Sequence, residues 1–204
     1  MGTVPLRFRR DGRTEPLRVI AGQYRSRPLR SLPGQEIRPT ADRLRETLFN
    51  VLTAGNPGGL QGSIWVDLYA GTGAVGIEAL SRGASKVHFV ESSAAAARLI
   101  RENLESLQVN TGVDLMQSDV VKALRRLETQ SAHLDFVFLD PPYNKEKEYR
   151  DTLEFLGKSS LLRDTTVVIA EHQKRFDPGE EIGPLRRYRK LVQSDAALSF
   201  YRKS

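Results

Sequence analysis

Residues 64–80, IWVDLYAGTGAVGIEAL, join a short apolar run to a glycine-rich turn and then to a helical pattern. The run over residues 63–69 predicts a buried strand, and the apolar spacing over residues 75–80 predicts a helix. Residues 71–76 form a GxGxxG motif, whose glycines let the chain turn tightly and let a ligand lie against the backbone. This order of strand, glycine turn and helix is typical of the ligand-binding edge of an open α/β sheet.

The alternation of strand and helix patterns continues along the chain. The two final strand patterns flank Gln193-Ser194-Asp195, which leaves too little room for a crossover helix and predicts an antiparallel hairpin. The expected fold is therefore α/β and Rossmann-like, with a seven-stranded, mostly parallel sheet covered on both faces. The seven expected strands lie at residues 63–69, 86–91, 113–117, 134–139, 166–171, 188–192 and 197–201.

The N-terminal part differs in amino-acid composition from the rest of the chain. Residues 1–36 are rich in Arg, Pro and Gly, with short β-like pieces such as residues 17–20. We predict a basic N-terminal segment over residues 1–36 and an α/β domain over residues 37–204. Thr40 is expected to cap a helix that Gly55 ends, with Arg43 and Arg45 projecting away from its apolar face.

The positive charge is concentrated in the first fifty residues. They contain eleven Arg, no Lys and five acidic residues, so their net charge of +6 equals that of the whole chain. Because a guanidinium binds phosphate through two parallel hydrogen bonds, this clustering predicts a nucleic-acid partner. A solvated basic face is the alternative for any single arginine. The candidate RNA-binding residues are Arg18, Arg25, Arg27, Arg30, Arg43 and Arg45.

Composition excludes several kinds of chemistry. The chain contains no Cys, which excludes disulfides, thiolate zinc sites and a cysteine nucleophile and fits a reducing compartment. Its three His are isolated in the sequence, so no metal centre is expected. The apolar runs are shorter than the roughly 20 residues that span a bilayer. We expect a soluble, cytoplasmic protein without a membrane anchor, and a monomer by default.

Asp67 distinguishes the glycine motif from a dinucleotide site. It stands four residues before the first glycine, at the expected mouth of the pocket, where a carboxylate would repel a pyrophosphate. The same carboxylate suits a ligand with a cationic amino acid head, such as S-adenosylmethionine. An NAD-dependent reductase is also disfavoured because no catalytic Tyr-Lys or His constellation is present.

The remaining residues of a cofactor site follow from this interpretation. The loop Gly71-Thr72-Gly73 would run alongside the methionine moiety. Glu91, at the end of the next strand, would bind the ribose hydroxyls. Asp119 would contact the adenine amine, although it could instead only cap a helix that begins at Val120. Tyr69 could line the same pocket.

The second motif is Asp140-Pro141-Pro142-Tyr143, which ends a buried strand. Two prolines fix the backbone, remove two N–H donors and leave nearby carbonyls free to accept hydrogen bonds. An exocyclic amine on a base is a poor nucleophile because its lone pair is delocalised into the ring. Hydrogen bonds to the Asp140 carboxylate and the Pro141 carbonyl would favour a pyramidal nitrogen, while Tyr143 stacks on an extruded base.

Together these motifs resemble the bacterial RsmD family. The resemblance runs from about Arg18 to Arg202 and rests on these two motifs and on several further stretches. They are residues 18–22 (RVIAG), 38–40 (RPT), 42–50 (DRLRETLFN), 78–83 (EALSRG) and 198–201 (LSFY).

The resemblance implies a class I S-adenosylmethionine-dependent methyltransferase that acts on N2 of a guanine in 16S ribosomal RNA. It also implies that Arg38 and Thr40 help close the cofactor and substrate pocket, and that the basic N-terminal part holds RNA. A small-subunit assembly particle is the expected substrate. Residues 1–16 precede the matching region and could be a natural extension, a misassigned start or a processed peptide.

Two alternatives remain from the sequence. One is a DNA amino-methyltransferase that acts on adenine N6 or cytosine N4, which the lack of a separate groove-reading element disfavours. The other is a nucleic-acid-binding protein that retains the fold without the activity, which the intact Asp140-Pro141-Pro142-Tyr143 motif disfavours.

Overall fold

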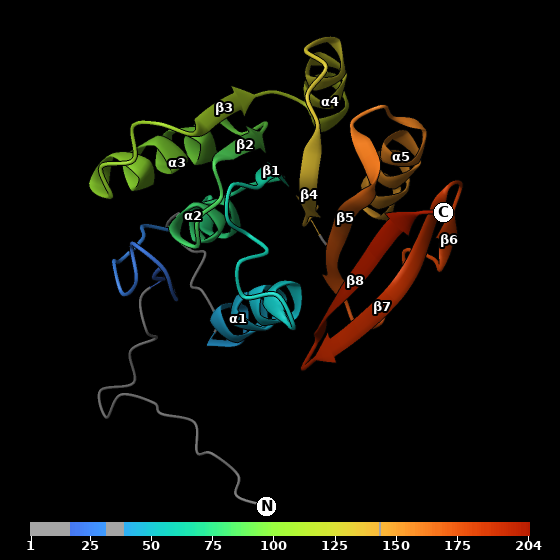
Figure 1. Cartoon of the computed structure of the whole chain (residues 1–204), viewed down its shortest axis with the longest axis horizontal. Helices are drawn as coiled ribbons and strands as arrows, with labels where there is room; N and C mark the ends of the chain where they lie inside the picture. The colour runs from blue at the N-terminus through green and yellow to red at the C-terminus, as the bar shows by residue number, and fades with distance from the viewer. Residues whose placement is uncertain (1–16, 32–38, 143) are drawn as a thin grey trace, which may run out of the picture.

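Eight strands form one sheet at the centre of the computed structural model, which describes residues 17–31, 39–142 and 144–204. The strands are β1 (Ile64–Leu68), β2 (Lys86–Glu91), β3 (Val113–Gln117), β4 (Leu134–Leu139), β5 (Leu162–Gln173), β6 (Glu181–Ile182), β7 (Leu185–Gln193) and β8 (Ala196–Lys203). Their order across the sheet is β3-β2-β1-β4-β5-β8-β7-β6, which Figure 1 shows. The five strands from β3 to β5 pair in parallel, whereas β8, β7 and β6 continue the sheet in antiparallel fashion.

The predicted α/β architecture is confirmed, but the predicted number of strands was too small by one. All seven expected strands are present, and β7 and β8 form the expected hairpin. The additional strand, β6, consists of two residues that pair with Arg186 and Leu185. Two residues are too few to produce an alternating pattern, so periodicity could not predict this strand.

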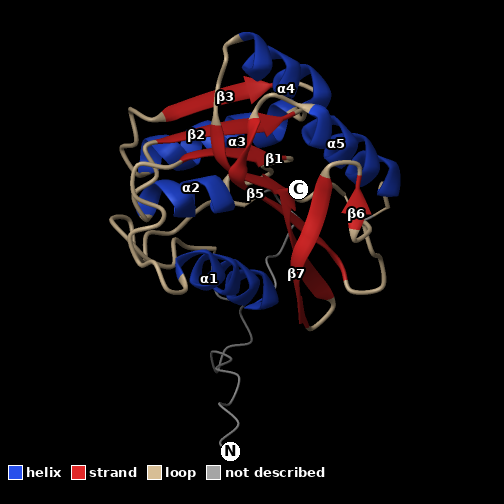
Figure 2. Ribbon diagram, turned by 45° about the vertical axis from the view of Figure 1, so that its right-hand side comes forward, coloured by secondary structure: helices blue, strands red, loops and turns tan. Residues whose placement is uncertain are grey.

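Five helices cover the two faces of the sheet (Figure 2). They are α1 (Pro39–Thr53), α2 (Ala74–Ser81), α3 (Ala94–Ser106), α4 (Val120–Thr129) and α5 (Glu146–Lys158). Buried residues of α1, α2 and α3 form one hydrophobic cluster with one face of the sheet, here called the α1 face. Buried residues of α4 and α5 form a second cluster with the opposite face. Within the described ranges, no helix is both long and apolar enough to cross a membrane.

Helix α1 differs from its prediction in the residue at which it begins and in the direction of one arginine side chain. It begins at Pro39, so Thr40 lies inside the helix and does not precede it. Proline suits this first position because its missing N–H has no partner there and its φ is already helical. The prediction that Arg45 projects away from the apolar face was wrong, since Arg45 is only 6% exposed, whereas Arg43 is exposed as expected.

The turn between β1 and α2 depends on a close approach at Gly76. A Cβ atom at this position would lie 2.3 Å from Cε1 of Phe89 and 2.8 Å from Cγ1 of Val87. Both neighbours are fully buried in β2. The glycine therefore lets the start of α2 pack directly on the sheet, which fixes the position of the preceding loop.

Residues 17–31 pack against α2 through a buried carboxylate. Glu78 of α2 is fully buried and accepts hydrogen bonds from the backbone N–H groups of Ile20 (2.7 Å) and Ala21 (2.9 Å). It also accepts from Nε of Arg82 (2.7 Å). Leu17, Val19 and Leu29 of the same segment join the hydrophobic cluster on the α1 face. The described part of the N-terminal segment thus shares the core of the α/β domain, and a domain boundary at residue 36 stays a prediction.

Replacing Gly76 with Ala should destabilise the fold by about 1–3 kcal/mol, because the added methyl group would overlap the buried ring of Phe89. Urea denaturation would measure the change in the free energy of unfolding. Gly58 is the matched control, because a Cβ there has no neighbour closer than 4.0 Å and its replacement with Ala should change the free energy by less than about 0.5 kcal/mol. Equal stability of the two variants would contradict the close packing.

Replacing Glu78 with Gln should destabilise the protein by about 3 kcal/mol, because it removes the charged partner of several buried donors. The effect should be local: in hydrogen exchange, the amides of Ile20 and Ala21 should exchange faster, while those of β1 stay protected. Glu102→Gln, at an exposed ion pair with Arg30, is the control and should leave these amides unchanged. Unchanged exchange in the Glu78 variant would show that other contacts hold the segment.

Candidate active site at the carboxyl ends of the parallel strands

Three acidic residues end neighbouring strands on the α1 face. Asp67 lies near the end of β1, Asp140 directly follows β4, and Glu171 lies near the end of β5. Each stands two positions after a residue of the cluster on the α1 face, namely Trp65, Phe138 and Ile169, and alternate residues of a strand point to the same face. The parallel sheet thus collects three carboxylates along one edge.

Burial governs the charge of these carboxylates. It raises the pKa of Asp67 to about 8 and that of Asp140 to about 7, because the ionised form loses its hydration. The pKa of Glu171 also lies well above its usual range, since Asp140 adds to the effect of burial while Arg45 opposes it. Within the described residues, no group of three or more His, Cys, Asp or Glu side chains could hold a metal ion.

The glycine turn after β1 is held by one carboxylate and one side-chain amide. Gly71 and Gly73 have φ values of 55° and 76°, in the left-handed region where glycine is favoured. Glu91 at the end of β2 accepts the N–H of Gly71 through Oε2 (2.9 Å). The carbonyl of Thr72 accepts a hydrogen bond from Nδ2 of Asn103 in α3 (3.0 Å). The predicted cofactor residues of this loop and Glu91 are therefore brought together around one turn.

Asp67 does not lie at the open mouth of the pocket, as the sequence analysis expected. It is only 2% exposed, and its Oδ2 accepts the N–H of Gly76 in the first turn of α2 (2.9 Å). A carboxylate in this position satisfies one of the unpaired N–H groups at a helix N-terminus. Asp67 thus stabilises the end of the glycine turn through Oδ2, and only its Oδ1 receives no hydrogen bond from the described residues.

Asp119 and Tyr69 are both joined to helices of the second hydrophobic cluster, α4 and α5. Asp119 is exposed and caps α4, because its Oδ1 accepts the N–H groups of Val121 (3.0 Å) and Lys122 (3.3 Å). The capping role that we considered as an alternative is confirmed, and contact with an adenine amine stays a prediction. The hydroxyl of Tyr69 forms a hydrogen bond with Thr152 of α5 (2.9 Å), and burial raises the pKa of Tyr69 to about 12.

The turn after β4 is built as an array of acceptors. Pro141 is buried and Pro142 is exposed, and the carbonyl of Pro142 accepts the N–H of Lys145 (2.9 Å). The hydroxyl of Tyr149 in α5 lies 3.3 Å from the Pro141 carbonyl and 2.8 Å from the Glu171 carbonyl. Because one hydroxyl proton serves both, the longer bond to Pro141 is weak and leaves that carbonyl able to accept another donor.

The side chains of three predicted site residues lie outside the described part of the structure. Arg38 and Tyr143 lie outside the described residues, and only the backbone of Thr40, in the first turn of α1, is described. Their assigned roles in closing the pocket and in stacking on a base stay predictions.

The predicted RNA-binding arginines fall into two groups. Arg18, Arg25, Arg27, Arg30 and Arg43 are exposed. Arg45 is buried, donates to Asp42 (3.0 Å) and to the carbonyl of Arg18 (2.6 Å), and lies 3.9 Å from Glu78. A guanidinium in this position cannot reach a phosphate, so the assignment of Arg45 as an RNA contact is corrected to that of a buried counter-charge.

The sequence analysis missed Glu171 and Asn103. Glu171 ends the apolar stretch Val167–Ala170, and an acidic residue at the end of a buried strand was a usable signal. Asn103 is fully buried and also pairs with the backbone of Arg30, accepting its N–H (2.8 Å) and donating to its carbonyl (3.2 Å). It had no recognisable signal, because its partners come from two other regions of the chain.

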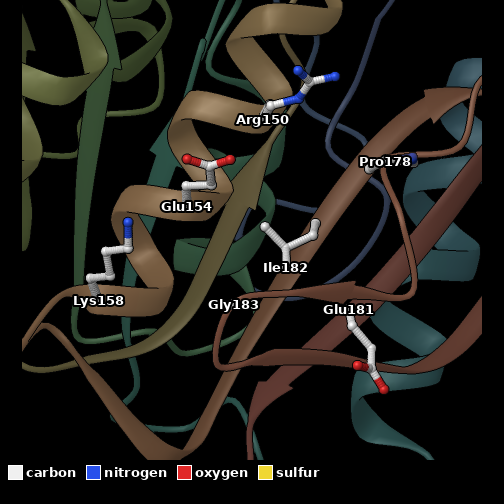
Figure 3. Close-up of a pocket in the computed structure, with 7 residues that line it drawn as sticks. All are labelled: Arg150, Glu154, Lys158, Pro178, Glu181, Ile182 and Gly183. Atoms are coloured by element: carbon white, nitrogen blue, oxygen red, sulfur yellow. The ribbon is translucent and has the colours of Figure 1, made fainter.

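A cavity of about 450 Å³ lies elsewhere, between α5 and β6 (Figure 3). Arg150, Glu154 and Lys158 of α5 line one side of it and Ile182 lines the other. None of the predicted site residues lines this cavity, so the acidic edge and not the cavity is the candidate active site.

Comparisons with known proteins agree with this geometry. A family model described as "Conserved hypothetical protein 95" matches residues 17–202. Ribosomal RNA small subunit methyltransferase D of Haemophilus influenzae is 33% identical over 159 residues, which cover 78% of this chain and 79% of that protein. The YlbH protein of Bacillus subtilis is 32% identical over 187 residues, covering 92% of this chain and 99% of the relative.

Solved structures show the same fold. The Escherichia coli protein YhhF superposes with a TM-score of 0.77 at 28% sequence identity, over 92% of this chain and 98% of that one. Because the family model and two relatives of more than 30% identity extend over most of the sequence, the chain belongs to the RsmD family of ribosomal RNA methyltransferases.

Proposed function

We propose that this protein transfers a methyl group from S-adenosylmethionine to N2 of a guanine in small-subunit ribosomal RNA. The observation that carries this proposal is the position of Asp140-Pro141-Pro142, whose acceptors lie on the sheet edge beside the glycine turn. Relatives named as small-subunit ribosomal RNA methyltransferases support RNA as the substrate. The choice of guanine N2 follows the family resemblance.

The acidic edge fits S-adenosylmethionine. Asp67 experiences the charges of both Asp140 and Glu91, and such a concentration of carboxylates favours a ligand that carries ammonium and sulfonium charges. A Cβ atom at Gly71 would have no neighbour closer than 3.9 Å, so this face of the turn is open to a ligand. When bound, S-adenosylmethionine supplies a methyl group that its sulfonium already activates. Glu91 would hold the ribose hydroxyls, and Asp119 the adenine amine.

The residues after β4 prepare the amine for transfer. The Asp140 carboxylate and the Pro141 carbonyl would accept the two N–H groups of the exocyclic amine, which favours a pyramidal nitrogen with a directed lone pair. These contacts strengthen as the nitrogen becomes positive, so they stabilise the transition state more than the bound substrate. An ionised Asp140 would also take up the proton that the methylated amine releases.

In this proposal the exposed N-terminal arginines hold RNA near this site. Asn103 ties Arg30 to the carbonyl of Thr72 in the glycine turn, so the basic segment runs beside the candidate cofactor site. Arg18, Arg25 and Arg43 offer further exposed guanidinium groups. We infer a small-subunit assembly particle as substrate, because a protein of this size has limited surface for choosing one base. A cytoplasmic monomer is part of the same proposal.

Radiolabelled methyl transfer tests the activity and the substrate together. S-adenosylmethionine would be offered with small ribosomal subunits, protein-free small-subunit RNA and genomic DNA in parallel, followed by nucleoside analysis. We expect N2-methylguanosine from small-subunit RNA, and faster labelling of a particle than of free RNA. Label only in DNA would replace this proposal by a DNA amino-methyltransferase, and equal labelling of free RNA would refute the dependence on a particle.

Asp140→Ala should reduce the methyl-transfer rate about 100- to 1,000-fold while S-adenosylmethionine binding stays nearly unchanged, because the lost contact matters most in the transition state. Single-turnover kinetics and calorimetric titration would separate the two effects. Asp164→Ala, at an exposed aspartate of β5, is the control and should retain wild-type values. A wild-type rate in the Asp140 variant would refute the mechanism.

The transfer rate should rise with pH across the neutral range. Burial raises the pKa of Asp140 to about 7, and the protonated carboxyl cannot accept the amine as the carboxylate does. The active form is therefore lost as the pH falls below 7, and a bound sulfonium cation would move the midpoint lower. Single-turnover rates at saturating S-adenosylmethionine between pH 5 and 9 would measure this profile. A rate that falls from pH 6 to pH 8 would contradict ionised Asp140 as the acceptor.

A further inference from the structure

Glu171 has no function in the mechanism described so far, yet it is the cross-strand neighbour of Asp140. In the parallel pairing of β4 with β5, Leu139 lies opposite Ala170, so the next residues, Asp140 and Glu171, adjoin. Neighbouring strands are about 4.8 Å apart. Both side chains point to the α1 face, because Phe138 and Ile169, two positions earlier, pack there.

Both residues are open to the same edge. Ala170 and His172 are fully buried, whereas Glu171 between them is partly exposed, and Asp140 is partly exposed after the buried Leu139. Neither carboxylate has a hydrogen-bond partner among the residues that the structure describes. By contrast, the carboxylates of Asp67 and Glu91 each accept a backbone N–H. Two adjacent carboxylates, which receive no hydrogen bond from the described residues, therefore lie at the edge where the proposed function puts the substrate base.

The charge of Arg45 favours the ionised form of Glu171, although the net effect of the surroundings holds the pKa of Glu171 well above its usual range. Arg45, buried in α1 on the same face, lowers the pKa of Glu171 by its charge, while burial and Asp140 raise it. The hydroxyl of Tyr149 donates to the Glu171 carbonyl (2.8 Å) and reaches the Pro141 carbonyl (3.3 Å), which joins the ends of the two strands. The backbone of Glu171 is thus fixed relative to the acceptors that follow β4.

We infer that Glu171 is a specificity-determining residue that accepts the N1–H of guanine while Asp140 and the Pro141 carbonyl accept the N2 amine. This inference rests on the proposed function and deepens it. The edge of guanine presents donors at both N1 and N2, so it matches a row of acceptors. Adenine and cytosine present an unprotonated ring nitrogen beside their amines, which an ionised Glu171 repels.

The variant Glu171→Gln tests this inference, because it should reverse the preference between guanine and a modified base. The target nucleotide, mapped in the labelling experiment, would be replaced by 2,6-diaminopurine through splinted ligation, and small subunits would be reconstituted from this RNA. This base keeps the 2-amine but carries an acceptor at N1. Glutamine can donate an N–H to that acceptor, whereas glutamate cannot when ionised.

The wild-type protein should prefer guanine over 2,6-diaminopurine by about 10- to 100-fold in kcat/KM, as expected for one well-placed base contact. In Glu171→Gln this preference should disappear or reverse. Any intrinsic difference in reactivity between the two amines is the same for both proteins, so it cancels when their preferences are compared. Asp164→Asn makes the same chemical change on the exposed part of β5 and should keep the wild-type preference.

The variant should fold, because the raised pKa of Glu171 means that its charge opposes folding at neutral pH, and Gln removes that charge. A thermal midpoint at pH 8 no lower than that of the wild-type protein, with unchanged binding of S-adenosylmethionine, would verify this. An unchanged guanine preference in the folded variant would overturn the role of Glu171 alone. Absence of N2 methylation by the wild-type protein would instead refute the proposed function, and this inference with it.

Discussion

The parallel pairing of β4 between β1 and β5 is the constraint on which the candidate site depends. Parallel strands end at one edge of the sheet, and the two-residue repeat directs Asp67, Asp140 and Glu171 to one face. Their burial follows from the helices and the N-terminal segment packed on that face, and it raises all three pKa values. An edge of this kind attracts positive charge and accepts N–H donors, which are the two properties that methyl transfer to an amine requires.

A second set of buried polar contacts positions the basic segment. Glu78 binds the backbone of Ile20 and Ala21, and Asn103 joins Arg30 to the glycine turn. Because buried polar groups are expensive to leave unpaired, these contacts define one position for the segment and not a range of positions. The arginines that would hold RNA are thereby linked to the loop that would hold the methyl donor.

Two acidic residues at the carboxyl ends of parallel strands stabilise the starts of helices. Asp67 accepts the N–H of Gly76 and so supports the helix start, and Asp119 caps α4 in the same way. These hydrogen bonds use one oxygen of each carboxylate, Oδ2 of Asp67 and Oδ1 of Asp119. Arg45 shows the opposite case, since burial commits its guanidinium to Asp42 and to a backbone carbonyl.

The sequence by itself determined the seven main strands, the helices between them and the two motifs at the strand ends, because periodic burial and turn chemistry are local properties. It also identified the family, since the combination of those motifs is highly specific. Only the tertiary structure decided which acidic side chains became neighbours. The pairing of Asp140 with Glu171, the burial of Arg45 and the role of Asn103 depend on strand register and on contacts between distant segments. A local pattern carries no record of these relations, because the same residues would give the same pattern in any register.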